Sequence, residues 1–173
     1  MTSRVLAVLA VASLVCALPV AAQRAGTIEV GGFARYVDFD NTLPMGDDMD
    51  IGGRVAVYLE PAVTVEVDLA RSSQSSVTYT PLHVRAVYNG SISSRLEALV
   101  GGGYVRNWYG APYSAADQGL TVLLGVRYRV RDQLWLRLGA DLDAMFHTAD
   151  NSLFNFYNGN WGIHFGPSVR LNR

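Results

Sequence analysis

A strict alternation of apolar and polar residues dominates the chain after residue 22. In 133–147 the even positions from Leu134 to Phe146 are apolar, whereas odd positions carry residues such as Arg137 and Asp141. Successive side chains of a β-strand point to opposite faces, so this run of about 15 residues predicts a strand much longer than the usual ~5–6 residues. Helical spacing of apolar residues persists nowhere beyond about one turn.

The same alternation recurs along the chain and predicts eight strands. Their connections alternate between tight turns rich in Pro, Gly, Asn and Asp and longer polar segments. We therefore expect an up-and-down antiparallel arrangement, with short turns at one end and long loops at the other. The predicted strands are 27–38, 50–59, 62–71, 79–88, 95–107, 118–130, 133–147 and 160–171.

The polar positions of these strands differ from a water-facing surface. They combine glycines with acidic residues and arginines in equal numbers, and the chain has no lysine. Balanced charges suit the narrow interior of a small barrel, where each charge needs a partner and glycines are expected to make room for long arginines. The candidate interior network is Arg54, Glu66, Asp68, Arg85, Glu97, Arg127, Arg137, Asp141 and Arg170.

The apolar positions fit a lipid-facing wall. They are mostly Leu, Val, Ile and Ala, and aromatic residues fall near the strand ends, where amphipathic rings favour the membrane boundary. An open sheet edge in hydrocarbon would leave backbone groups unpaired, so the strands must close. The predicted fold is all-β, an eight-stranded antiparallel up-and-down transmembrane β-barrel. Its candidate aromatic girdle is Tyr36, Tyr88, Tyr104, Tyr128, Phe146 and Trp161.

The N-terminal residues 1–22 have the pattern of a signal peptide. Arg4 precedes an apolar stretch from Val5 to Leu18, and small residues lead to a predicted cleavage after Ala22. The apolar stretch is shorter than the ~20 residues of a spanning helix, which disfavours an uncleaved anchor. We expect an exported protein whose barrel domain is 23–173 and whose single cysteine, Cys16, leaves with the leader.

Composition excludes several classes of function. The 173 residues carry a net charge of -1, and all 14 basic residues are arginine. The absence of lysine excludes a P-loop lysine and Schiff-base catalysis, and the charge balance disfavours nucleic-acid binding. One cysteine cannot form a disulfide framework or a thiolate zinc site. No cofactor or metal is expected.

The segment 38–50 carries five carboxylates: Asp38, Asp40, Asp47, Asp48 and Asp50. Clustered oxygens suit hard cations such as calcium, but Leu43 occupies the position where an EF-hand loop requires glycine. We interpret the segment as a solvated outer loop. The alternative is a cation-binding loop that bridges to lipopolysaccharide phosphates.

The histidines His83, His147 and His164 are predicted to face inward, which raises the question of a hydrolase. His164 and Ser168 lie four residues apart on one face, roughly 13 Å along a strand, so they are too far apart to form a hydrogen bond. The sequence therefore does not predict an enzyme.

Several segments of the chain resemble the transmembrane domain of outer membrane protein A and related eight-stranded barrels. These are the strand, proline turn and strand at 52–67, the glycine-rich strand at 96–104 and the closing strand at 162–171. The resemblance implies an interior locked by carboxylate–guanidinium pairs, at Glu66 and Arg137 with Arg85 and Glu97 nearby. Two departures are expected: the family's peptidoglycan-binding domain is absent, and the last strand ends without an aromatic residue.

These features predict an outer-membrane protein of a Gram-negative-type envelope. We expect periplasmic termini and short turns, four outer loops, a structural role in membrane integrity, and recognition or adhesion through the loops. Outer-membrane lipid or lipopolysaccharide and the outer-membrane assembly machinery are the expected partners of a monomer. The alternatives are a narrow pore or small-molecule channel and a soluble periplasmic lipocalin-like binder.

Overall fold

The computed structural model describes residues 25–39, 46–72, 77–111, 114–146, 156–157 and 159–171. These ranges contain eight long strands and one strand of two residues. None of them contains a helix long and apolar enough to cross a membrane. The strands are β1 (Ile28–Asp38), β2 (Asp48–Glu60), β3 (Val63–Arg71), β4 (Tyr79–Ser91), β5 (Leu96–Tyr109), β6 (Ala115–Arg129), β7 (Leu134–Phe146), β8 (Phe156–Tyr157) and β9 (Trp161–Leu171).

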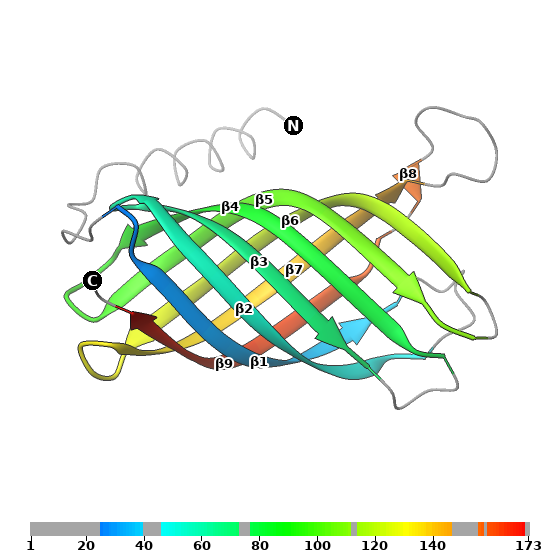
Figure 1. Ribbon diagram of the computed structural model, residues 1–173, viewed down its shortest axis with the longest axis horizontal. Coiled ribbons are helices and arrows are strands. Elements are labelled where there is room, and N and C mark those ends of the chain that lie inside the picture. Colours follow the sequence, from blue (N-terminus) through cyan, green and yellow to red (C-terminus); the bar gives the residue numbers. More distant parts are fainter. Residues whose placement is uncertain are drawn as a thin grey trace, which may run out of the picture.

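The long strands form one closed antiparallel barrel. Strands β1 to β7 pair in sequence order, β7 pairs with β9, and β9 returns to β1. Figure 1 shows the strands strongly inclined to the long axis of the barrel. Closure leaves no long strand with a free edge in the described ranges, and the fold predicted from the sequence is confirmed.

The short strand β8 is a feature that the alternation did not predict. Its two residues pair with Met145 and Phe146 at the end of β7. It lies within 148–159, which the sequence analysis assigned to a long connection, because two residues are too few for a period of two to be recognised.

Short turns and longer connections lie at opposite ends of the barrel, as predicted. The turns after β2, β4 and β6 lie at the end where β9 finishes, whereas β1, β3, β5 and β7 finish at the other end, from which the longer connections start (Figure 1). In the β4–β5 turn, the Ser93 hydroxyl accepts hydrogen bonds from the backbone N–H groups of Arg95 and Leu96. We call the two ends the short-turn end and the long-loop end.

Burial follows the alternation in the direction expected for a membrane wall. Outward Ile51 and Leu124 are 76% and 58% exposed, whereas inward Arg137 is 1% exposed. A soluble barrel has the opposite pattern, because it buries its apolar positions and exposes charged ones. The soluble lipocalin-like alternative is therefore not supported.

The inward glycines serve mainly to let neighbouring strands approach, which corrects the expectation that they make room for arginines. A Cβ at Gly103 would overlap the carbonyl oxygen of Val84 and lie 2.8 Å from Arg85 Cα. Gly162 does lie beside an arginine side chain, since a Cβ added there would be 3.1 Å from Arg35 Cδ. A narrow barrel coils its strands strongly, and glycine is suited to such close backbone contacts.

We predict that Gly103→Ala destabilises the barrel, because the added methyl group meets backbone that cannot move aside. Overpacking of this kind lowers the free energy of unfolding by about 1–3 kcal/mol. The matched control is Gly102→Ala, whose outward Cβ would lie 3.5 Å from the nearest atom outside its chain neighbours. Urea unfolding of the refolded protein measures both, and equal midpoints for the two variants would contradict the explanation.

Candidate functional site

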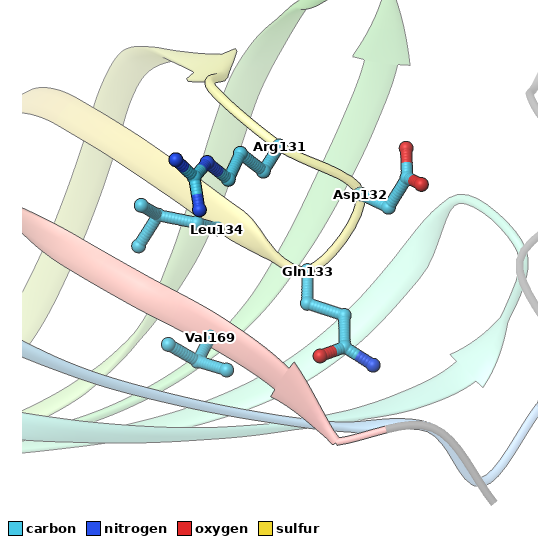
Figure 2. A pocket seen from close by; sticks show the side chains of 5 residues that line it. All are labelled: Arg131, Asp132, Gln133, Leu134 and Val169. Carbon is cyan, nitrogen blue, oxygen red and sulfur yellow. The ribbon is translucent and has the colours of Figure 1, made fainter.

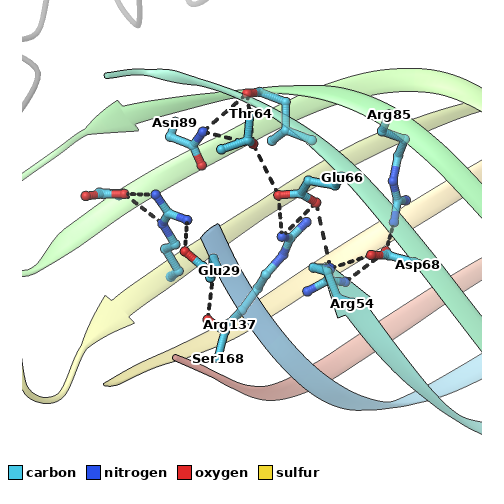
Figure 3. Close-up of polar contacts among 12 residues, drawn as sticks. Glu29, Arg54, Thr64, Glu66, Asp68, Arg85, Asn89, Arg137 and Ser168 are labelled. Carbon is cyan, nitrogen blue, oxygen red and sulfur yellow. Dashed lines mark hydrogen bonds and ion pairs between the residues drawn. The ribbon is translucent and has the colours of Figure 1, made fainter. Parts of the chain in front are cut away.

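The centre of the lumen is crossed by ion pairs between distant strands. Arg137 Nη1 on β7 donates to both carboxylate oxygens of Glu66 on β3, at 2.9 Å each. The Nε atom of Arg54 on β2 lies 3.7 Å from Glu66 Oε2 and 2.7 Å from Asp68 Oδ1. Figure 3 shows these side chains pointing toward one another inside the barrel. The structure thus brings together the carboxylate and the guanidinium that the resemblance identified.

A second set of contacts continues the network toward the long-loop end. Arg85 donates to Asp68 and Asp141, and the Nδ1 atom of His164 lies 2.9 Å from Asp141. Arg85 therefore bridges two carboxylates, and it is also the cross-strand neighbour of Glu66. We call the following residues the central layer: Arg54, Glu66, Asp68, Arg85, Arg137, Asp141 and His164.

Two arginines and two glutamates fill the short-turn end of the lumen. Arg127 lies 3.0 Å from Glu29 and 2.5 Å from Glu97, so Glu97 belongs to this group and not to the pair formed by Glu66 and Arg137. Arg170 lies 3.1 Å from Glu29. We call the following residues the short-turn layer: Glu29, Tyr58, Glu97, Arg127, Trp135, Ser168 and Arg170.

Aromatic rings enclose the arginines of the short-turn layer. The guanidinium carbon of Arg170 lies 3.9 Å from the ring centroid of Trp135 and 5.3 Å from that of Tyr58. Arg127 lies over the same two rings. Tyr58 and Trp135 were absent from the predicted site. The alternation could have found them, because both occupy inward positions of their strands.

At the long-loop end, paired charges lie next to an apolar cluster. Arg35 donates to Asp50 at 2.6 Å, and the Nε2 atom of His83 lies 3.1 Å from Asp143. Phe39 packs edge-on against Tyr79, with ring centroids 4.8 Å apart. We call the charged pairs and this cluster the long-loop layer; the cluster consists of Val37, Phe39, Val77, Tyr79 and Tyr109.

The predicted acidic loop is partly strand, which corrects its interpretation as a solvated segment. Strand β2 begins at Asp48, two residues earlier than predicted, and the buried Asp48 accepts a hydrogen bond from Ser72. Asp50 is buried against Arg35. The loop interpretation failed because Asp48 and Asp50 lie at the same alternate positions of β2 as Arg54 and therefore face the lumen.

The other three carboxylates have different positions. Asp38 is half-buried at the end of β1, exposed Asp47 accepts a hydrogen bond from Tyr36, and Asp40 lies outside the described residues. Within the described ranges, no group of three or more His, Cys, Asp or Glu side chains is arranged to hold a metal ion.

The six aromatic residues of the candidate girdle all lie on the outward face. Tyr88 and Tyr128 lie close to the short turns, whereas Tyr36 and Trp161 pack edge to face near the long-loop end, with ring centroids 6.0 Å apart. Tyr104 donates a hydrogen bond to Gln118 at 3.1 Å. Phe146 is half-buried at the end of β7. Outward Trp108 was missed; its ring lies 5.4 Å from the guanidinium carbon of Arg106.

Among the described residues that were considered for a hydrolase, His164 and Ser168 have different partners. His164 contacts Asp141, whereas the Ser168 hydroxyl donates to Glu29 at 2.7 Å. His147 lies outside the described residues.

A depression of about 650 Å³ lies beside the β6–β7 turn (Figure 2). It is lined by Arg131, Asp132, Gln133, Leu134 and Val169. None of these five residues is buried, and the backbone N–H of Arg170 donates to the carbonyl of Gln133 at 2.9 Å. The hydrogen bond joins the turn to the end of β9, so the depression is a feature of the turn surface.

Comparison with known proteins identifies the family. A family model described as the outer membrane protein beta-barrel domain matches residues 7–167. No curated protein matches the chain.

Solved structures show the same fold at low sequence identity. Neisserial surface protein A is 18% identical, with a TM-score of 0.63 over 84% of this chain and 99% of that one. The N-terminal β-barrel domain of Pseudomonas aeruginosa OprF is 14% identical, with a TM-score of 0.62 over 86% and 100%. Ail of Yersinia pestis is 12% identical, with a TM-score of 0.52 over 86% and 100%. Because the family model spans most of the sequence, the chain belongs to the outer membrane protein β-barrel family, which implies a location in the outer membrane.

Proposed function

We propose that this protein is a structural, non-conducting barrel that supports outer-membrane integrity and presents its long loops at the cell surface for recognition or adhesion. The observation that carries the proposal is the filling of the lumen at three levels, by the short-turn, central and long-loop layers. A conducting path needs charges that remain solvated, whereas these charges are buried and bonded to one another.

The network also supports a mechanical role. Its ion pairs join strands far apart in sequence, such as β3 with β7 through Glu66 and Arg137, and β1 with β6 through Glu29 and Arg127. A buried pair holds its strands in one register, because a shift would separate charges in a medium that solvates them poorly. We propose that a monomer, inserted by the outer-membrane assembly machinery, is sufficient for this role.

Topology supports the recognition half of the proposal. Strands β1, β3, β5 and β7 all finish at the same end of the barrel (Figure 1), so the longer connections start from that end. Ail, named for attachment and invasion, has the same fold. In the proposed orientation the long-loop end faces the outside and the short-turn end faces the periplasm.

We predict that Glu66→Gln lowers the free energy of unfolding by about 3–5 kcal/mol, because it leaves Arg137 buried without its carboxylate. The control is the double variant Glu66→Gln with Arg137→Met, which removes both charges and recovers most of the loss. Urea titration with heat-modifiability gels measures the folded fraction. An unchanged midpoint for the single variant would show that the pair does not lock the barrel.

We predict that the refolded protein produces no stepwise current in planar lipid bilayers. Insertion is verified separately, by recovering the heat-modifiable folded band from vesicles of the same preparation. Discrete openings whose size rises with salt concentration would favour the narrow-pore alternative and reject the non-conducting barrel.

Cysteine labelling of intact cells tests the proposed orientation. In a Cys16→Ala background, Gly46→Cys marks the long-loop end and Asp132→Cys marks the β6–β7 turn; both native residues are exposed. A membrane-impermeant maleimide should label the Gly46→Cys protein on whole cells, and the Asp132→Cys protein only after the outer membrane is permeabilised. The reverse pattern would overturn the proposed orientation.

A further inference from the structure

The outer wall of the barrel carries a groove of about 390 Å³ along β2 and β3. Its sides are formed by the exposed side chains of Ile51 and Leu69, and its floor lies at Gly53, which is paired with Leu69 and has no side chain. The groove is lined by Ile51, Gly52, Gly53, Leu69, Ala70, Arg71 and Thr80. An apolar hollow in this wall has the shape and chemistry to receive an acyl chain.

A second outward glycine lies beside the groove floor, on β1. Gly32 is exposed and is the cross-strand partner of Gly53. A Cβ on either glycine would meet no atom closer than 3.7 Å outside its chain neighbours. Strand packing therefore does not require glycine at these two positions, in contrast to Gly103, and the hollow is open toward the lipid.

The groove has a cationic end. Arg71 is exposed as the last residue of β3, opposite Ile51, and Thr80 on β4 is half-exposed beside the same groove. In the described part of the chain, Arg71 has no carboxylate within ion-pair distance, whereas every arginine of the central layer has one. An uncompensated guanidinium next to a hydroxyl suits a phosphate group.

A second groove on the wall lacks this cationic end. It has a similar volume, about 400 Å³, and lies along β6, β7 and β9. It is lined by Leu124, Gly125, Val126, Leu138, Gly139, Ala140 and Ile163. Since this lining has no charged side chain and no hydroxyl, the groove can contact any acyl chain but offers nothing to a headgroup.

We propose that the groove along β2 and β3 binds one phosphorylated glycolipid of the outer leaflet, a lipopolysaccharide. An acyl chain lies between Ile51 and Leu69, and Arg71, assisted by the Thr80 hydroxyl, binds a lipid phosphate. Basic side chains at a membrane surface attract anionic lipid in this way. The choice of glycolipid rests on the proposed orientation, which places the long-loop end in the outer leaflet.

The test is native mass spectrometry of the refolded full chain, released from detergent after incubation with lipid A, phosphatidylglycerol or phosphatidylcholine. We expect one retained lipid A, with weaker retention of phosphatidylglycerol and little of phosphatidylcholine. Arg71→Gln should reduce lipid A retention about fivefold, the effect of one basic residue near a membrane surface. Arg106→Gln is the matched control, because Arg106 is also outward and exposed but does not line the groove.

A second variant tests the apolar half of the site. Gly53→Leu fills the groove without meeting the protein closely, since its Cβ would lie 3.8 Å from the Gly31 carbonyl oxygen. It should abolish the retained lipid A, whereas Gly102→Leu, on the outward face of β5, should not. Heat-modifiability confirms that each variant is folded.

Three results would overturn the proposal. These are unchanged retention in Arg71→Gln, equal retention of lipid A and phosphatidylglycerol, and a dimer of this chain that Gly53→Leu dissociates, which would assign the groove to a second copy. The binding measurement in detergent does not depend on orientation. Lipid binding can therefore fail while the labelling and conductance predictions hold, and those predictions can fail while lipid binding holds.

Discussion

Every backbone N–H and C=O group that enters hydrocarbon must find its partner within the protein, and this constraint shapes the whole molecule. Strands satisfy it only when the sheet closes, which the β9–β1 pairing achieves. Eight strands leave an interior just wide enough for side chains. Many of the inward side chains are charged, so the narrow interior brings arginines and carboxylates within bonding distance of one another across the lumen.

The interior network follows from this confinement. Removing a charge from water is costly, and only close, well-formed contacts with the opposite charge offset the cost. Arg127 contacts two glutamates, and Arg170 adds the faces of Tyr58 and Trp135. On the outer wall most side chains are apolar and face lipid. Arg71 lies at the edge of this wall and has no acidic partner in the described part of the chain.

Much of this architecture was accessible from the sequence, since a period of two assigns each residue to a face. It predicted the strands and the inward position of Glu66 and Arg137. It could not tell that Glu97 pairs with Arg127, because the choice of partner depends on strand register and on distances across the lumen. Asp48 and Asp50 were assigned to a loop because the segment 38–50 carries five carboxylates, although both aspartates lie at alternate positions with Arg54. The close strand contacts at Gly103 depend on barrel coiling, which alternation does not report.

The central claim, that the interior is closed and its charges are bonded to one another, is tested most directly by hydrogen exchange at the arginine side chains. Nuclear magnetic resonance of the refolded protein resolves the Nε–H groups. Those of Arg54 and Arg127, which donate to Asp68 and Glu97 at 2.7 Å, should exchange with water far more slowly than that of exposed Arg106. Exchange as fast as that of Arg106 would show a water-filled lumen and contradict the account.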